Sequence, residues 1–244
     1  MHSNSKIIRL KTVDSTHKFA LRLVESGKAM ECAIIAENQT AGIGRCNRSW
    51  KSSSGNLFTS ILKKLPQKNH ECGKLSLLVA CAVHEAISHY IPHELYLHWP
   101  NDIYYKKSKL AGILIAVIDC WIVISVGINV SSTPKVDVAI SLRDICKQHI
   151  VSVEEIFDNV LVELDKWFNI FDVLGFSYIK NYWLQYINEI NCKVIIRNGG
   201  SSISGIIRGI DDMGRLILEE NHRNLLISSG DMFLNTEGIT VSYE

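Results

Sequence analysis

A short glycine-bearing loop combines residue types that can bind an anion beside an aromatic ring. Gly42 and Gly44 allow a positive φ and a close approach of the backbone to a ligand. Arg45 and Arg48 can donate paired hydrogen bonds to phosphate or carboxylate oxygens, and Trp50 offers a flat face to a ring. A surface hairpin with two solvated arginines would show the same local pattern, so the loop needs support from other segments.

Polar groups follow apolar, strand-like runs in three further segments: Trp99-Pro-Asn-Asp102, Lys109-Leu-Ala-Gly-Ile-Leu114 and Gly127-Ile-Asn129. Together with Asp14-Ser-Thr-His17 and the loop Gly42–Trp50, these segments resemble, in the same order, the motifs of the biotin protein ligases. Several segments in the right order make the resemblance specific. It extends over nearly the whole chain.

The resemblance implies an α+β fold in two domains. Residues 1–190 would form a class II synthetase-like biotin/lipoate ligase catalytic domain, with a mixed β-sheet flanked by helices. Residues 191–244 would form a small SH3-like β-barrel, which Gly209–Leu216 and Ser229–Asp231 resemble. The sequence itself favours this division, because short β runs broken by turn residues begin near Cys192.

The apolar patterns predict the elements that must position these residues. Strands are expected at 7–10, 33–36, 57–62, 94–99, 110–118 and 121–130, and helices at 17–25, 73–90, 153–171 and 176–186. The last two of these strands are expected to form a hairpin. In the C-terminal part, strands are expected at 193–197, 203–210, 216–219, 225–228 and 230–233.

The biotin protein ligases activate biotin with ATP as biotinoyl-AMP and transfer it to a lysine of a biotin carboxyl carrier protein. Two negatively charged substrates meet in this reaction, so clustered cations are needed to offset their repulsion. The resemblance gives this role to Arg45 and Lys109, with Asp102 as a third catalytic residue. Three roles stay open for Asp102: it can bind Mg²⁺, orient Lys109 or act as a base. A solvated lysine at a strand edge is the alternative for Lys109.

The resemblance also implies a biotin pocket with a polar end. Ser15, Thr16 and Gln39 match the contacts to the ureido group, and Gly42 and Gly112 would let the backbone lie against the ligand. Helix capping is the competing interpretation for Ser15 and Thr16, and one hydroxyl can cap while its neighbour faces the ligand. A β-bulge is the alternative for Gly112.

For the nucleotide, the resemblance implies contacts from Arg45, Arg48, Trp50, Asn101 and Asn129. Adenine is expected to stack on the indole of Trp50, while the two amides read the purine edge and the sugar. The implied substrates are ATP, with Mg²⁺, and biotin. No metal site built from the chain's own ligands is expected, because the histidines and cysteines lack metal-site spacing.

Four positions depart from the family pattern. Ile43 stands where the first loop arginine is usual, and Asn47 replaces a glycine, although asparagine tolerates the left-handed conformation well. His17 and His98 replace an asparagine and a lysine, and both are interpreted as groups at the pocket rim or surface. Ile43 and Asn47 also support an alternative, a non-catalytic biotin or nucleotide sensor.

A lipoate or octanoate ligase is the enzymatic alternative, but the chain lacks the Arg-Arg-x-x-Gly-Gly-Gly loop of that family. The formal net charge of +1 gives no general attraction to DNA or to a membrane. The 7 cysteines without a Cys-x-x-Cys pair, and the absence of an apolar run of about 20 residues, predict a soluble cytoplasmic protein. Only 13 residues precede Asp14, so no DNA-binding repressor domain is expected.

Two questions stay open at this level. Two chains could pair through an exposed strand such as Trp121–Val130, giving a homodimer. The loop Gly42–Ser54, which is rich in Gly, Ser and Asn, is hypothesised to become ordered when biotin or the adenylate binds.

Overall fold

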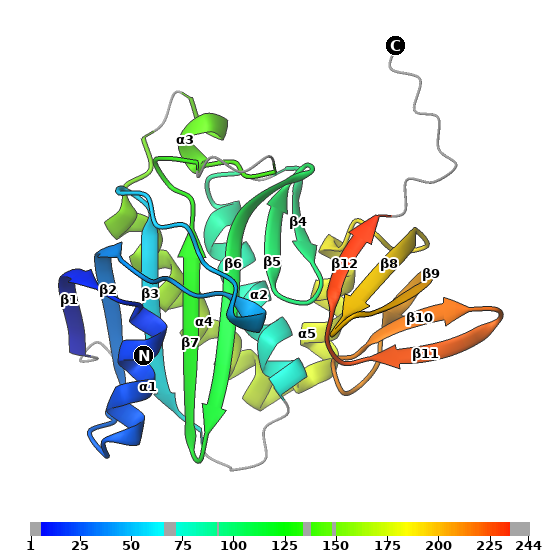
Figure 1. Cartoon of the computed structure of the whole chain (residues 1–244), viewed down its shortest axis with the longest axis horizontal. Coiled ribbons are helices and arrows are strands. Elements are labelled where there is room, and N and C mark those ends of the chain that lie inside the picture. The colour runs from blue at the N-terminus through cyan, green and yellow to red at the C-terminus, as the bar shows by residue number, and fades with distance from the viewer. Residues whose placement is uncertain (1–5, 66–71, 92, 134–137, 148–149, 235–244) are drawn as a thin grey trace.

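The computed structural model describes residues 6–65, 72–91, 93–133, 138–147 and 150–234. It contains a seven-stranded sheet in the order β1-β2-β3-β7-β6-β5-β4 and a five-stranded sheet in the order β11-β10-β9-β8-β12 (Figure 1). In the large sheet β1 and β2 are parallel and the other neighbours are antiparallel. The predicted mixed α+β fold is therefore confirmed.

The strands of the large sheet are β1 (Lys6–Val13), β2 (Cys32–Gln39), β3 (Leu57–Lys64), β4 (Leu95–His98), β5 (Asp102–Tyr105), β6 (Ser108–Ile118) and β7 (Trp121–Ile128). The helices are α1 (Thr16–Glu25), α2 (Cys72–Ser88), α3 (Leu142–Ile145), α4 (Val153–Leu174) and α5 (Phe176–Tyr186), with a 3₁₀ turn at Arg45–Asn47. The small sheet consists of β8 (Lys193–Asn198), β9 (Ser201–Ile210), β10 (Leu216–Glu220), β11 (Arg223–Ile227) and β12 (Asp231–Leu234).

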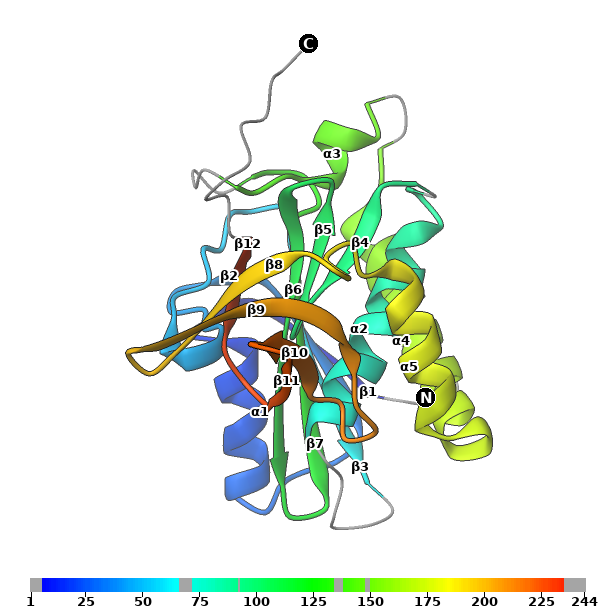
Figure 2. The same ribbon diagram turned by 90° about the vertical axis from the view of Figure 1, so that its right-hand side faces the viewer.

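Helices cover both faces of the large sheet, which explains why its central strands are apolar on both sides. Figure 2 shows α1 on one side of the sheet and α2, α4 and α5 on the other. In β2, Ala33 and Ile35 belong to the core beneath α2, whereas Cys32 and Ile34 pack with Ala20 of α1. The period of two along a strand thus divides one apolar run between two cores.

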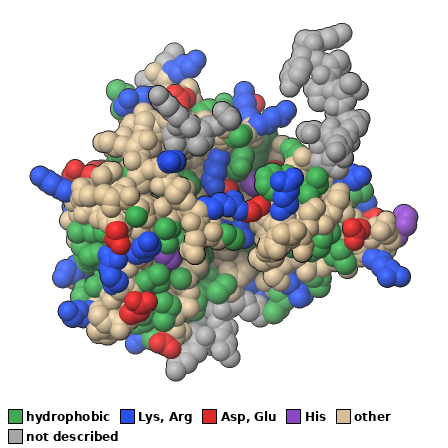
Figure 3. All heavy atoms as spheres, in the orientation of Figure 1, with side chains coloured by type: hydrophobic (Ala, Val, Ile, Leu, Met, Phe, Trp, Pro, Cys, Tyr) green, Lys and Arg blue, Asp and Glu red, His purple; other side chains and the backbone are tan. Residues whose placement is uncertain are grey.

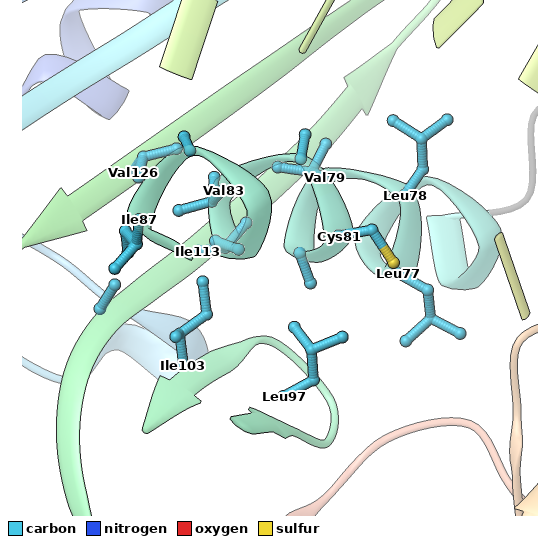
Figure 4. Packing of buried hydrophobic residues seen from close by; sticks show 14 of the residues in the cluster. Leu77, Leu78, Val79, Cys81, Val83, Ile87, Leu97, Ile103, Ile113 and Val126 are labelled. Atoms are coloured by element: carbon cyan, nitrogen blue, oxygen red, sulfur yellow. The ribbon is translucent and has the colours of Figure 1, made fainter. Parts of the chain in front are cut away.

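Helix α2 is the central helix of the larger core. Figure 4 shows its side chains Val83 and Ile87 beside strand residues such as Ile113 and Val126. The sequence predicts a polar face for this helix that includes His84, but His84 is buried and the prediction is wrong at this position. The reason is tertiary, because the Tyr182 and Tyr186 rings of α5 pack against the His84 ring.

Strand β7 lies at the centre of the large sheet, between β3 and β6. Its hairpin with β6 is confirmed. Pairing of two chains through Trp121–Val130 is excluded, because both edges of β7 are already hydrogen-bonded and the end strands of the sheet are β1 and β4. The sequence did not predict β5, a four-residue strand that follows the Trp99-Pro100 peptide and pairs with both β4 and β6.

The C-terminal β module is confirmed as a five-stranded antiparallel sheet. Its end strands, β11 and β12, do not pair with each other in the part of the chain that the structure describes. The boundary between residues 190 and 191 stays a prediction. No helix among the described residues has the length and hydrophobicity needed to span a membrane, and all seven cysteines are unpaired.

Candidate active site

A cavity of about 370 Å³ lies where the glycine-bearing loop meets β5, β6, β7 and the small sheet. This volume falls in the usual range for a small-molecule site, about 300–1,000 Å³. The predicted site residues that line it are Thr16, Gln39, Arg45, Arg48, Trp50, Asn101, Asp102, Lys109, Gly112 and Asn129. Ser15 and Gly42 do not line it.

Lys109 and Asp102 form a close ion pair in this cavity. Lys109 Nζ donates a hydrogen bond to Asp102 Oδ2 at 2.5 Å, and the two side chains are 30% and 17% exposed. The Lys109 backbone N–H donates a hydrogen bond to Val138 O, and its carbonyl accepts one from Ile140 N. These two bonds fix the backbone position from which the side chain extends. Lys109 is therefore not a solvated lysine at a strand edge. Asp102 Oδ1 is buried without a hydrogen-bond partner, so one carboxylate oxygen is left unsatisfied by the described residues.

Backbone hydrogen bonds hold the glycine-bearing loop in a narrow hairpin. Trp50 N donates to Gly42 O at 2.9 Å, and Gly44 N donates to Arg48 O at 2.7 Å. Neither glycine uses the positive φ that its type allows: Gly44 has φ −118°, whereas Cys46 and Asn47 have φ 52° and 56°. The tolerance of Asn47 for the left-handed conformation is thereby confirmed. Ordering of this loop by a ligand stays a prediction.

Both loop arginines are held by residues from other parts of the chain. Arg45 Nη1 donates to Asn101 Oδ1 and to the Gly230 carbonyl, both at 3.2 Å, and burial lowers the pKa of its guanidinium. Arg48 forms an ion pair with Asp231 at the start of β12. Figure 3 shows cationic and acidic side chains meeting near the centre of this face, where the two sheets adjoin. The small sheet thus forms part of the cavity wall.

The Trp50 indole lies flat on two glycines of the β6–β7 hairpin. A Cβ atom at Gly112 would lie 2.8 Å from Trp50 Cζ3, and one at Gly127 would lie 2.7 Å from Trp50 Cε2. The two glycines are directly opposite each other in the ladder, so together they form a flat floor. The bulge between β5 and β6 lies at Ile103 and Tyr104, which excludes a simple bulge as the reason for Gly112. Stacking of adenine on Trp50 stays a prediction.

The two asparagines support neighbouring groups. Asn101 accepts the hydrogen bond from Arg45 and donates to the Ile113 carbonyl, so both ends of its amide are engaged. Asn129 is buried and donates from Nδ2 to the Lys109 and Ile140 carbonyls, at 3.4 and 3.1 Å. Its Oδ1 has no partner. The side-chain oxygen of Asn129 is thus left unsatisfied by the described residues, whereas Asn101 positions Arg45.

A polar network lies at the α1 end of the cavity. Ser15 caps α1 by accepting a hydrogen bond from Lys18 N, while Thr16 faces the cavity and bonds to Gln39. Capping and cavity lining are therefore divided between the two neighbouring hydroxyls. Gln39 Nε2 donates to Ser52 Oγ at 3.2 Å, which connects the network to the segment after the loop.

Neither substituted histidine is exposed at the surface, but each contacts a residue that lines the cavity, so only the surface alternative is wrong and a place at the pocket rim stays a prediction. His17 is 6% exposed, its Nδ1 lies 2.7 Å from Ser125 Oγ, and burial lowers its pKa to about 4. His98 bonds through Nδ1 to Glu189 Oε1 at 2.8 Å, and its ring packs on Tyr104, which lines the cavity. The burial of His17 and the partial burial of His98 both depend on residues far away in the sequence, Ser125 and Glu189.

The described residues contain no cluster of three or more His, Cys, Asp or Glu side chains that could hold a metal ion. Asp102 Oδ1 is a buried carboxylate oxygen, without a hydrogen-bond partner, of a residue that lines the cavity. A single carboxylate suits Mg²⁺ that arrives with substrate phosphates, because this ion keeps several waters and takes its other ligands from phosphate oxygens.

The chain matches two family models. One, described as the biotin/lipoate A/B protein ligase family, covers residues 10–131, and the other, described as the biotin protein ligase C terminal domain, covers residues 190–235. The chain belongs to the biotin/lipoate protein ligase family. The Asp102–Lys109 pair and the loop arginines lie within the first matched range, and Asp231 lies within the second.

Relatives in this family align with nearly the full chain. The biotin--[acetyl-CoA-carboxylase] ligase of Mycobacterium tuberculosis is 33% identical over 89% of this chain and 85% of its own length. The bifunctional ligase/repressor BirA of Escherichia coli is 31% identical over 87% of this chain and 68% of its own length. The structure of biotin protein ligase from Aquifex aeolicus in complex with biotin and ATP superposes with a TM-score of 0.83 at 27% identity, over 94% of this chain and 98% of that one.

Sequence reasoning missed several residues of the site. Ser125 and Gly127 line the cavity, and their signal was the alternation along β7, where both fall on the face opposite Ile124 and Val126. Asp231 also lines the cavity, but it lies 183 residues from its partner Arg48, and no local pattern could place it there.

Proposed function

We propose that the protein is an ATP-dependent ligase that activates biotin as biotinoyl-5'-AMP and then transfers the biotinoyl group to a specific lysine of a carrier domain. One observation carries this proposal: a single cavity joins a cluster of cations to a hydroxyl-lined polar end. The cations are Lys109, Arg45 and Arg48, and the polar end includes Thr16 and Ser125. A carboxylate with a polar head group at the other end of a short chain fits this arrangement.

In the first step, an oxygen of the biotin carboxylate attacks the α-phosphorus of ATP, and the bond to the pyrophosphate oxygen breaks. Negative charge accumulates on the phosphorus oxygens, and preorganised cations in a partly buried site stabilise it. We assign this role to Lys109 and Arg45. Asp102 Oδ2 would hold Lys109 in place through its hydrogen bond, and Asp102 Oδ1 would bind the Mg²⁺ that ATP brings.

In the second step, the ε-amine of the carrier lysine attacks the acyl carbon of the mixed anhydride, and AMP leaves with the electron pair of the broken C–O bond. The amine must lose a proton to react. Lys109, paired with Asp102, would stabilise the departing phosphate here as well. Trp50, Asn129 and Arg48 are the proposed nucleotide contacts, because the first two have unpaired polar atoms in the cavity region and the third lines its wall.

The polar end of the cavity favours biotin over lipoate or octanoate. A dithiolane ring or an alkyl chain has no N–H to offer to the hydroxyls of Thr16 and Ser125, and buried polar groups without partners are costly, about 1–3 kcal/mol each. The ureido ring of biotin supplies such donors. The acceptor is proposed to be an apo biotin carboxyl carrier protein, and the unpaired cysteines support a reducing, cytoplasmic compartment.

The deciding experiment incubates the purified protein with Mg-ATP and an equimolar mixture of biotin and lipoate, and identifies the products by mass spectrometry. Biotinoyl-AMP alone is expected. Lipoyl-AMP would instead make the protein a lipoate ligase. Bound biotin with no adenylate would favour a sensor. In that case the loop would lack a cation that the reaction needs, because Ile43, which also lines the cavity, stands where an arginine is usual.

A further inference from the structure

We propose that His17 is a positioning residue that fixes the direction of a chain of hydroxyl groups, so that Ser125 presents only a lone pair to the polar end of the cavity. The occupant recognised there is an N–H group of the ligand. This inference rests on the proposed function, in which that ligand is the ureido ring of biotin. It gives His17 and Ser125, which belong to no predicted contact, a role in specificity.

The direction of the chain starts from a backbone donor. The backbone N–H of Thr16 donates to Gln39 Oε1 at 2.8 Å, and a backbone N–H cannot accept, so this atom of the amide must be the oxygen. Thr16 Oγ1 lies 3.2 Å from the same oxygen. Because a carbonyl oxygen has no proton to give, the Thr16 hydroxyl must be the donor in this contact.

Each following contact then has only one solution. Ser60 Oγ lies 2.9 Å from Thr16 Oγ1, whose proton is already used, so Ser60 donates. Ser125 Oγ lies 2.8 Å from Ser60 Oγ, and by the same argument Ser125 donates. His17 Nδ1 lies 2.7 Å from Ser125 Oγ and must therefore carry the proton of that contact. The chain runs in one direction from His17 to Gln39.

The opposite tautomer of His17 would break this order. If Nδ1 were unprotonated, the single proton of Ser125 would face two acceptors, and one buried contact would be left without a hydrogen. Ser60 and His17 are almost fully buried, so water cannot repair the loss. Burial also keeps the imidazole neutral at pH 7, with its pKa at about 4, which leaves a single proton whose position matters.

The consequence appears at the two hydroxyls that line the cavity, Thr16 and Ser125. Each has accepted one hydrogen bond and given its own proton away, so what remains on each oxygen is a lone pair. Such a surface accepts ligand N–H groups and repels ligand lone pairs. Sites built this way reject isosteric analogues that lack the donor far more strongly than they reject changes in size.

The test uses isothermal titration calorimetry with biotin and with two cyclic carbamate analogues, each of which has oxygen in place of one ureido N–H. Wild-type protein is expected to bind biotin at least tenfold more tightly than one of the analogues. In Ser125→Ala and His17→Leu this preference should shrink to about twofold, with biotin affinity reduced and kcat for adenylate formation nearly unchanged. His17→Asn, which keeps an amide N–H at the place of Nδ1, should restore it.

His84→Asn is the matched control, because His84 is buried like His17, but its hydrogen-bond partners, the Tyr182 hydroxyl and the Leu95 carbonyl, do not line this cavity. It is expected to lower the unfolding temperature without changing the preference for biotin. A preference that stays the same in His17→Leu and Ser125→Ala would overturn the inference, even if both variants were less stable. Should His17→Leu fail to fold, Ser125→Ala and His17→Asn still decide. Wild-type protein that binds no biotin at all would refute the proposed function itself.

Discussion

The two faces of the large sheet are built from the same strands but carry different chemistry. Along β7, Ile122 and Ile124 point into the core beneath α2 and α4, which is apolar and closed. On the opposite face, Ser125 and Gly127 line the cavity. The face beneath α2 and α4 therefore stabilises the fold. The opposite face accommodates polar groups and a cavity, because helix α1 covers only part of it.

Two buried histidines among the described residues, His17 and His84, show what distinguishes these faces. Burial lowers the pKa of both His17 and His84 to about 4. His84 lies between the Tyr182 hydroxyl and the Leu95 carbonyl, so its hydrogen bonds end inside the core. The bonds of His17 continue through Ser125 to the cavity. A perturbed pKa alone does not mark a functional group; the place where its hydrogen bonds lead does.

The largest effect is expected from Lys109→Ala, on the cavity side. Removing the cation at the reacting centre should lower the rate of adenylate formation by about 10³-fold, or roughly 4 kcal/mol of transition-state stabilisation. The free energy of unfolding should change little. Measurement of pyrophosphate release and of urea unfolding separates the two quantities.

Lys106→Ala is the control for this variant. Lys106 lies in the turn just before β6 and pairs with Glu94 at an exposed position outside the cavity. Its removal should leave both quantities unchanged. Turnover by Lys109→Ala at the wild-type rate would take Lys109 out of the mechanism and would remove the chemical contrast between the two faces.

The opposite result is expected from Leu78→Ala, on the core side. Leu78 is completely buried in the core around α2, and its truncation should cost about 2–5 kcal/mol of unfolding free energy, because a cavity is left behind. The KM for biotin should not change. Val173→Ala, at an exposed position of α4, should cost less than about 0.5 kcal/mol. A KM raised severalfold in Leu78→Ala would show that the two faces are coupled.

Acid titration probes both faces at once. In the folded chain His17 and His84 stay neutral down to about pH 4, whereas in the unfolded chain they take up protons below about pH 6.5. The unfolded state binds more protons in this window, so the free energy of unfolding should fall as the pH falls from 6.5 to 4. The expected slope is about 1.4 kcal/mol per pH unit for each histidine.

Urea unfolding between pH 7 and pH 5 measures this slope. In His84→Gln the slope should decrease by the contribution of one histidine, about 1.4 kcal/mol per pH unit. Biotin binding should keep its wild-type pH dependence. A slope that is the same in wild type and variant would contradict the burial of a neutral His84.

The sequence predicted most elements because their causes are local. The apolar period of α4 and the capping box of Ser152 and Glu155 are both contained in the segment itself. The missed strand, β5, has four residues, and it exists because β4 and β6 lie on its two sides. The burial of His84 likewise depends on α5, which follows it by about a hundred residues.

The candidate site was predictable where its residues belong to short motifs, such as Asp102 and Lys109, whose ion pair agrees with one of the roles left open for Asp102. It was not predictable where distant segments meet. Asp231 reaches the cavity from the small sheet, and Ser60 enters the hydroxyl chain because it lies directly opposite Ser125 in the ladder of β3 and β7. Register and domain packing supply this information, and local patterns do not contain it.

The smallest effect is expected where the small sheet meets the cavity, in Asp231→Asn. The ion pair with Arg48 is partly exposed, and such pairs contribute about 0.2–1 kcal/mol. Without it, Arg48 is held less firmly at the cavity wall, so the KM for ATP should rise about threefold, with unfolding unchanged. Asp212→Asn is the control, since Asp212 pairs with Lys180 at an exposed position in the turn between β9 and β10 of the same sheet. A KM that falls instead would mean that Asp231 competes with phosphate for Arg48, and the small sheet would then restrain the loop arginines rather than position them.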